Sequence, residues 1–595
     1  MSSSICKAAS EIVIRGQSAS PGIAFGTVVR PEDARLQFNF SHIAADEVPA
    51  ELKRLYKGLA KARRQLNILK ERMAKELGQE HAYILDAQIL MLQDSSLFES
   101  VERIISEKLV NAEWAIKLAI EPFLAAYASI SDGYLRERGS DIEDVANRLM
   151  RVIAGKRRSR SALKSNSILV SDDLPPSIFA ELKLSQLAGI ATSSGGWASH
   201  TSIIARGLRI PCVVGLGSIT ELCSGQSAII DGSEGLIVVN PTEATIDHFR
   251  ELSQQRKRSF HALLAQSKYP AITADGKEIK LRANIELPSE VSSVTRFGAQ
   301  GIGLFRSEYL YLNMLPQARS EEGQYEIYSR LVDVCGKQPV TIRTFDLGPV
   351  AFDAEPEPNP ALGLRGIRLL LRYKDLLNTQ LRAILRVSSK GNIRVLLPMV
   401  SQVDEVLTVR KTISELSAKL QASGTDCSKH IPLGIMVEVP ATVIILDRLL
   451  PYVDFVNIGT NDLVQYLLAV DRDNQSVSSL YLPLHLSVLR AIKHIVDTVR
   501  SANKAVEVCG EMACSPVGSA ALLAVGVETL SVTPSAIPVL KDAIRHLHLA
   551  KLKELLDEIK NIDDPLQAER CFVTALQSHS PGFLDAFKLV EPQRR

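Results

Sequence analysis

The chain has 595 residues, of which 46% are hydrophobic and 23% charged, as in soluble globular proteins, and this length predicts roughly two to four domains. Its net charge of +2 argues against general affinity for nucleic acid or acidic membranes, and no segment approaches the length of a membrane-spanning helix. Eight cysteines without paired zinc-site spacing indicate a reduced, cytoplasmic setting.

The first residues read as short strands with turns, at Ile12 to Arg15, Ser18 to Gly26 and Val28 to Val29. Four further buried strands are expected later in the chain, at residues 167–171, 187–192, 211–215 and 228–232. With a helix that begins near His200, these strands predict a compact α/β domain over residues 1–35 and 155–245.

Between these two parts the pattern becomes helical. In a first predicted helix, apolar residues recur three and four positions apart, at Leu52, Leu55, Leu59, Ala62, Leu66, Leu69 and Met73. After this helix, four more helical runs are expected, at residues 83–92, 97–109, 114–127 and 142–153. Residues 36–154 are therefore expected to form an inserted helical bundle; composition alone indicates nothing more specific.

The α/β domain contains the stretch around which the chain is organised, a glycine turn followed by a helix. Gly195 and Gly196 permit unusual backbone conformations, Ser199 is a candidate N-cap, and His200 falls in the first helical turn. The helix dipole disfavours the imidazolium form there, so the ring is a neutral nucleophile. We expect His200 to carry a phosphoryl group; the alternative is a histidine that merely caps its helix.

Residues 246–269 are polar and helix-compatible, and are expected to link two domains. Beyond them, strands and helices alternate as in a (β/α)8 TIM-type barrel over residues 270–570, followed by a C-terminal tail at 571–595. The eight expected strands start at Ile279, Gly301, Val340, Ile393, Leu433, Phe455, Ala505 and Leu530. The overall fold class is thus multidomain α/β.

Several barrel strands end in charged or reactive residues, where such barrels place their active sites. Glu438 and Asp462, at the fifth and sixth strands, are expected to hold Mg²⁺; the alternative is that they only pair with arginines. Arg306, Arg343 and Arg472 end or follow strands, and arginine forks match phosphate and carboxylate oxygens. Phosphoryl transfer requires such charge neutralisation.

These stretches resemble enzyme I of the bacterial phosphotransferase system from about Ile14 to about Ala550. The run Gly195-Gly-Trp-Ala-Ser-His200-Thr-Ser-Ile-Ile-Ala-Arg206 is similar to the phosphohistidine signature that enzyme I shares with phosphoenolpyruvate synthase and pyruvate phosphate dikinase. Gly301-Ile-Gly-Leu-Phe-Arg306-Ser-Glu-Tyr, Ile458-Gly-Thr-Asn461-Asp462 and Cys509-Gly-Glu resemble further enzyme I motifs.

The resemblance implies phosphoryl transfer from phosphoenolpyruvate to His200 and on to an HPr-like carrier docked on the bundle, with release of pyruvate. It also implies a homodimer formed through the barrel. In this scheme Cys509 protonates the enolate as general acid, although a buried strand cysteine alone is more often an apolar filler. The implied ligand sets are Arg306, Arg343, Asn461 and Arg472 for phosphoenolpyruvate, and Glu438 and Asp462 for Mg²⁺.

The chain departs from the family pattern at three places: Pro175, Trp197-Ala198 and Pro349-Val350-Ala351. These departures favour one alternative, a weakened relative that acts as a binding or signalling module, while the intact histidine, arginines, carboxylates and cysteine oppose it. A regulatory branch of enzyme I is a second alternative. The regulatory branch usually carries a sensory domain before the Ser-Pro-Gly segment, and only about twenty residues precede that segment here. The synthase and the dikinase need an ATP-binding domain that the stretch before His200 is too short and too helical to supply.

Overall fold

The computed structural model divides the chain into two compact units, residues 1–255 and residues 256–590, each described by itself. The structure describes residues 10–30, 38–77, 88–89, 91–93, 95–128, 133–155, 165–172, 174, 178–179, 182, 186–196, 199–208, 210–219, 222, 224–313, 319–348, 357, 359–428, 430–472, 474, 477–559 and 561–588.

The first unit contains a mixed eight-stranded sheet in the order β1-β8-β7-β3-β4-β5-β6-β2. Its strands are β1 (Ile12–Arg15), β2 (Gln17–Ser20), β3 (Ile23–Val29), β4 (Ser167–Ser171), β5 (Leu187–Thr192), β6 (Cys212–Val214), β7 (Ser227–Asp231) and β8 (Leu236–Val239). The central β3, β4, β5 and β6 run parallel, whereas β7 and β8 pair antiparallel. Strand β8, which the sequence analysis missed, pairs with β1 along its full length.

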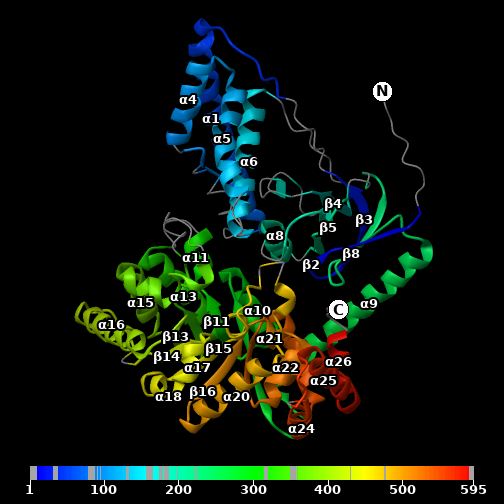
Figure 1. Ribbon diagram of the computed structural model, residues 1–595, viewed down its shortest axis with the longest axis vertical. Helices are drawn as coiled ribbons and strands as arrows, with labels where there is room; N and C mark the ends of the chain where they lie inside the picture. The colour runs from blue at the N-terminus through cyan, green and yellow to red at the C-terminus, as the bar shows by residue number, and fades with distance from the viewer. Residues whose placement is uncertain are drawn as a thin grey trace. The chain divides into compact units, whose positions relative to one another are not determined.

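Four long helices are inserted between β3 and β4 and pack against one another (Figure 1). They are α1 (Val48–Leu77), α4 (Ser95–Lys108), α5 (Ala112–Ala128) and α6 (Gly133–Ile153). The predicted apolar seam of α1 faces inward, because Leu55 and Leu66 are fully buried. The prediction of an inserted bundle is thereby confirmed for the described residues.

The sheet buries both faces. Ile168, Val170 and Val213 fill one face together with the strand-end loops, while Ile190 and Cys212 belong to a core that also includes the bundle helices. Helix α8 (His200–Leu208) packs onto β2 and β6 through this second core. The apolar side of α8 therefore fixes the residue at its N-terminus relative to the sheet.

The second unit is a closed barrel of eight parallel strands, since β10 pairs with both β11 and β17. The strands are β10 (Glu278–Ile285), β11 (Ile302–Arg306), β12 (Val340–Arg343), β13 (Ile393–Leu397), β14 (Leu433–Val437), β15 (Phe455–Gly459), β16 (Ala505–Cys509) and β17 (Thr529–Val532), with β9 (Ala271–Ile272) antiparallel to β10. All eight expected strands and the TIM-type fold class are confirmed. Most strand ends differ from the expected ones by no more than one or two residues. The sixth strand differs more, because it ends at Gly459 and Asp462 lies in a helix.

Helices surround this barrel (Figure 1). They are α10 (Val291–Arg296), α11 (Glu308–Asn313), α13 (Glu321–Cys335), α14 (Ile367–Arg372), α15 (Lys374–Val387), α16 (Val403–Ala422), α17 (Pro440–Ile444), α18 (Leu446–Leu449), α19 (Thr460–Leu468), α20 (Leu486–Ser501), α21 (Glu511–Cys514), α22 (Pro516–Ala524), α23 (Ile537–Arg545), α24 (Leu549–Ile559), α25 (Pro565–His579) and α26 (Pro581–Lys588). A search of the described helices found none with the length and apolar character needed to cross a membrane.

Two segments that flank the barrel are helical. Helix α9 (Glu243–Gln266) covers most of the expected linker, and the boundary between the units falls inside it, after Gln255. We expected a tail from residue 571, but residues 571–588 lie mainly in α25 and α26. Phe572 and Phe583 there are fully buried in the barrel core, and burial of each aromatic ring contributes to its stability.

A buried ion cluster crosses the barrel interior. Glu507 on β16 accepts from Arg394 Nη1 on β13 at 2.8 Å and also pairs with Arg282 on β10. Burial alone would raise the pKa of Glu507, but Arg394 and Arg282 outweigh burial and hold the pKa below its usual value. The cluster joins strands on different sides of the barrel, so it fixes their mutual position beneath the mouth.

We predict that Glu507→Gln destabilises the barrel by about 3–5 kcal/mol at pH 7, because it leaves two buried guanidinium groups without their counter-charge. A depressed carboxyl pKa adds stability above the unfolded-state value, about 4.3, and this stability is lost as pH falls through the lower folded-state pKa. The difference in free energy of unfolding between wild type and variant, measured by calorimetry, should therefore become smaller below about pH 4. Glu558→Gln, at an exposed position, is the control; equal effects of both substitutions would contradict the prediction.

Candidate functional site

Helix α8 begins at His200, directly after a glycine turn. Ser199 acts as the N-cap, since the Ser202 N–H donates to Ser199 Oγ at 3.3 Å, and the Ser202 hydroxyl donates to Gly196 O at 2.6 Å. Gly195 has φ of +99°, a region that favours glycine. The local structure thus agrees with the predicted turn, cap and helix start, and a helix N-terminus is a favourable place for a phosphoryl group.

The three departures from the enzyme I pattern, at Pro175, Trp197-Ala198 and Pro349-Val350-Ala351, lie outside the described residues. Described neighbours nevertheless stabilise the turn before α8. The Thr201 hydroxyl donates to Leu174 O at 3.1 Å, which joins α8 to the segment after β4. The Thr192 hydroxyl donates to Ser194 O at 2.7 Å and closes the end of β5. The turn is therefore supported on both sides.

The barrel aligns the other predicted residues at the carboxyl ends of its strands. Arg306 and Arg343 are register partners on β11 and β12, and Gly459 is the partner of Cys509 on β15 and β16. Glu438 directly follows β14. Because parallel strands end at one face of a barrel, these side chains belong to one mouth.

Two carboxylates that follow the neighbouring strands β14 and β15 lie in this mouth. Glu438 is 1% exposed and accepts a hydrogen bond from the Met399 N–H at 2.7 Å. Burial, together with the negative charges of Asp462 and Asp346, raises the pKa of Glu438 to about 8. Asp462 lies in the first turn of α19 and is also buried. Such a pair is unfavourable without a compensating cation.

Arginines supply part of that compensation. Arg365 Nη2 lies 3.3 Å from Asp462 Oδ2 and donates to Asp346 Oδ2 at 2.6 Å. Arg343 Nη1 lies 3.4 Å from the same Asp346 oxygen. Burial alone would raise the pKa of Asp346, but Arg365 and Arg343 hold it below its usual value. The alternative that the carboxylates pair with arginines is therefore true in part.

The remaining predicted cations occupy the rim. Arg306 Nη1 donates to Glu286 Oε1 at 2.5 Å, and Arg472 Nη1 lies 3.7 Å from Asp462 Oδ1. Both guanidinium groups are partly exposed, with side-chain accessibilities of 38% and 37%. A polyanionic ligand could therefore reach them from solvent and replace their present partners.

Sequence reasoning missed Asp346 and Arg365 because neither ends a strand. Asp346 stands three residues after Arg343, and Arg365 follows the short η5 helix (Pro360–Leu362). Asp346 stands in the stretch Thr344-Phe-Asp-Leu-Gly, directly after the third strand. A search for charged residues in the loop after that strand would have found both.

Asn461 and Cys509 complete the mouth. The Glu511 N–H donates to Asn461 Oδ1 at 2.9 Å, and Cys509 Sγ lies 3.6 Å from Ile458 O. Burial, reinforced by the charge of Glu438, raises the pKa of Cys509 to about 12, so the thiol keeps its proton. Gly510 has φ of +109°, and a Cβ there would lie 2.2 Å from Thr460 Oγ1, so only glycine fits between Cys509 and Asn461.

The carboxylate pair fits a magnesium ion. Asp462 Oδ1 is buried and has no hydrogen-bond partner among the described residues. A Cβ at Gly459 would lie 2.7 Å from Glu438 Oε2, so the glycine leaves room beside that oxygen. No group of three or more metal-ligating side chains occurs in the described part of the chain. Mg²⁺ suits a two-carboxylate site because it keeps several water or substrate ligands.

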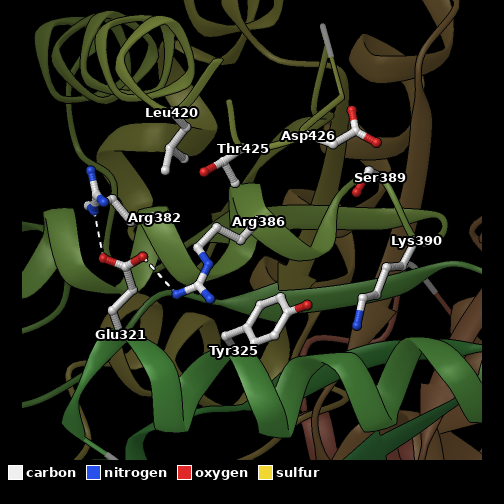
Figure 2. Close-up of a pocket in the computed structure, with 9 residues that line it drawn as sticks. All are labelled: Glu321, Tyr325, Arg382, Arg386, Ser389, Lys390, Leu420, Thr425 and Asp426. Carbon is white, nitrogen blue, oxygen red and sulfur yellow. Dashed lines mark hydrogen bonds and ion pairs between the residues drawn. The ribbon is translucent and has the colours of Figure 1, made fainter. Parts of the chain in front are cut away.

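A separate cavity of about 370 Å³ lies between α13, α15 and the end of α16 (Figure 2). It contains none of the residues predicted from the sequence. Its charged groups largely neutralise one another, since Glu321 pairs with both Arg382 and Arg386. The barrel mouth, where buried carboxylates lack full compensation, is therefore the better candidate site.

Three family models match the chain. They are the N-terminal model of PEP-utilising enzymes at residues 15–138, the mobile domain of these enzymes at 163–235, and their PEP-binding domain at 261–549. The first model spans β2, β3 and most of the bundle, the second spans α8 and strands β4 to β7, and the third spans the eight barrel strands.

Curated relatives match over almost the whole chain. The phosphoenolpyruvate-protein phosphotransferase of Haemophilus influenzae is 36% identical over 551 residues, covering 92% of this chain and 96% of that protein. The protein of the same name from Priestia megaterium is 35% identical over 556 residues, with the same coverage. A solved structure described as Enzyme I (nEIt) is 35% identical over 41% of this chain and 99% of that chain, with a TM-score of 0.36.

We predict that, in the native protein at pH 8, iodoacetamide alkylates Cys509 at least about 100-fold more slowly than the exposed Cys571. The reason is that iodoacetamide reacts only with the thiolate form of cysteine. Mass spectrometry of the digested protein would measure both rates. In protein unfolded by urea the two cysteines should react at similar rates. This control shows that both cysteine-containing peptides are detected equally well after digestion. Similar rates in the native protein would show that Cys509 is not a buried, protonated thiol.

Proposed function

The chain belongs to the family of phosphoenolpyruvate-protein phosphotransferases, the enzyme I family, and we propose that His200 and the barrel mouth carry out its reaction. The chain transfers the phosphoryl group of phosphoenolpyruvate to protein, the first step of a phosphotransferase system. The observation that carries the assignment is the meeting of Arg306, Arg343 and a buried carboxylate pair at one barrel mouth.

In the proposed reaction a neutral imidazole nitrogen of His200 attacks phosphorus, and the bond between phosphorus and the enol oxygen breaks. The enolate of pyruvate is the leaving group. The methylene carbon takes a proton from the Cys509 thiol and yields pyruvate, and solvent returns a proton to sulfur. A thiol that stays protonated suits this donor role. The phosphohistidine then passes its group to a histidine of an HPr-like carrier.

Binding and orientation of phosphoenolpyruvate would fall to the arginines. The negative charge on its phosphate and carboxylate oxygens would be neutralised by Arg306, Arg343 and Arg472. Asn461 would donate a hydrogen bond from its side-chain amide. Arg365 would contribute to substrate binding without touching the substrate, because it holds Asp346 and Asp462 in place. Phosphoryl transfer depends mainly on positioning and charge neutralisation, which these groups supply.

Glu438 and Asp462 would hold Mg²⁺, which when bound neutralises charge on the phosphoryl oxygens. The helical bundle of α1, α4, α5 and α6 would dock the carrier, and two chains would associate through their barrels in the cytoplasm. Family membership supports these four assignments. The rival functions, a regulatory enzyme I and a weakened signalling module, share the fold and differ in partner or in rate.

We predict that the full chain incubated with ³²P-phosphoenolpyruvate and Mg²⁺ takes up about one acid-labile, base-stable label per chain. His200→Ala should take up none while it keeps its thermal unfolding profile, because the substitution removes only the acceptor. Scintillation counting after acid and alkaline treatment measures this label. Absence of label in wild type would favour the signalling module, and unchanged label in His200→Ala would exclude His200 as the acceptor.

We also predict that Mg²⁺ binding at pH 7 releases close to one proton, because the raised pKa leaves most Glu438 protonated in the metal-free protein. Affinity should rise as pH increases to about 8 and then level off. Titration calorimetry in two buffers of different ionisation enthalpy measures the released proton. Glu438→Gln should bind weakly without proton release; full affinity in this variant would remove Glu438 from the proposed site.

A further inference from the structure

Gln380 is a fully buried amide on α15, in a helix face otherwise made of Leu377, Leu381 and Ile384. Burying a polar group costs free energy unless it is hydrogen-bonded, so a glutamine in this place needs partners. All its hydrogen-bonding groups find them within the second unit. The partners come from two directions, the strand ends of the barrel mouth and helix α13.

Toward the mouth, Gln380 contacts both arginine-bearing strand ends. Its Nε2 donates to Ser307 Oγ at 2.9 Å, and Ser307 Oγ in turn donates to Arg343 O at 2.6 Å. Its Oε1 accepts from the Phe345 N–H at 3.0 Å. Ser307 directly follows Arg306, and Phe345 lies between Arg343 and Asp346. One amide thus connects the backbones that carry Arg306, Arg343 and Asp346.

Toward α13, the second Nε2 hydrogen goes to Tyr328 OH at 3.2 Å. Tyr328 donates onward to Gln324 Oε1 at 3.2 Å, and both residues are fully buried. Burial raises the pKa of Tyr328, which keeps its hydroxyl protonated and able to donate. The hydroxyl of this arm leads into α13, while the Tyr328 ring packs edge-on against Phe305 of β11, with 6.2 Å between the ring centroids.

The two helices are also joined on the solvent side. Glu321 at the start of α13 accepts from Arg382 Nε at 2.6 Å and from Arg386 Nη1 at 2.9 Å on α15 (Figure 2). These ion pairs fix α15 against α13 independently of the buried amide. Replacing Gln380 should therefore disturb the strand ends more than the helix packing.

We propose that Gln380 is a positioning residue for phosphoenolpyruvate binding: through Ser307, Phe345 and the Arg343 carbonyl it holds the Arg306 and Arg343 strand ends in register. The inference rests on the proposed function of these two arginines. The amide suits the role because its one acceptor takes a backbone N–H and its two donors serve two hydroxyls, so its orientation is fixed. A misplacement of about 1 Å at a binding site can cost about 100-fold in rate.

The test compares three substitutions in the full chain. Gln380→Met keeps the shape but removes both arms. Ser307→Ala removes the hydroxyl that joins Gln380 to the Arg343 carbonyl. Tyr328→Phe removes the hydroxyl that leads to α13 and keeps the ring contact with Phe305. The readouts are thermal unfolding and single-turnover pyruvate release at rising phosphoenolpyruvate concentrations. All three variants should lose some thermal stability. Gln380→Met and Ser307→Ala should raise the half-saturating concentration about 10-fold or more, and Tyr328→Phe should leave it unchanged.

The effects of Gln380→Met and Ser307→Ala should also fail to add in the double variant, because both cut the same connection. If Gln380→Met only lowers stability, as Tyr328→Phe does, its role is structural and the proposal is overturned. If Gln380→Met does not fold, the contrast of Ser307→Ala with Tyr328→Phe decides alone, and equal half-saturating concentrations overturn the proposal. If the wild-type protein itself releases no pyruvate, the proposed function is overturned, and this inference is overturned with it.

Discussion

The site depends on the repulsion between carboxylates that the barrel forces together. Glu438 follows β14, Asp462 lies in the first turn of α19 after the adjacent β15, and Asp346 lies in the loop after β12, and all three side chains are buried. Arg343 and Arg365 offset the charge of Asp346 but leave Glu438 with a raised pKa. The negative charge of an ionised Glu438 is therefore not fully compensated by these arginines. A divalent cation is the simplest group that would compensate it, and this makes the mouth suitable for a small polyanion bridged by metal.

Much of this arrangement could be predicted from residue patterns, because parallel strands ending in Arg306, Arg343, Glu438 and Cys509 must meet at one barrel face. Roles that depend on loops could not. Arg365 and Asp346 follow no period, and their pairing depends on how the loop after β12 folds back. Strand β8 was missed because Leu236-Ile-Val-Val is short, and its pairing with the distant β1 is a non-local contact.

Two boundary predictions failed for related reasons. Asp462 was assigned to a strand end because it follows the apolar run Phe455-Val-Asn-Ile-Gly closely, yet helix α19 begins at Thr460. Residues after 571 looked like a tail because barrel periodicity had ended. In the structure Phe572 and Phe583 bury their rings against barrel helices. Helical segments with few but large apolar residues give weak periodic signals and still contribute substantially to a core.

The same burial has opposite consequences for two neighbouring groups in the mouth. Removal from water disfavours charge, so Glu438 tends to be neutral when it should be a metal ligand, and Cys509 stays protonated when it should be an acid. A cation beside Glu438 would resolve the first difficulty by favouring its ionised form. It would also ease the second after proton transfer, since less negative charge beside a thiolate makes that thiolate less costly. Burial thus suits the Cys509 thiol as it stands, whereas it suits Glu438 as a metal ligand only when a cation lies beside it.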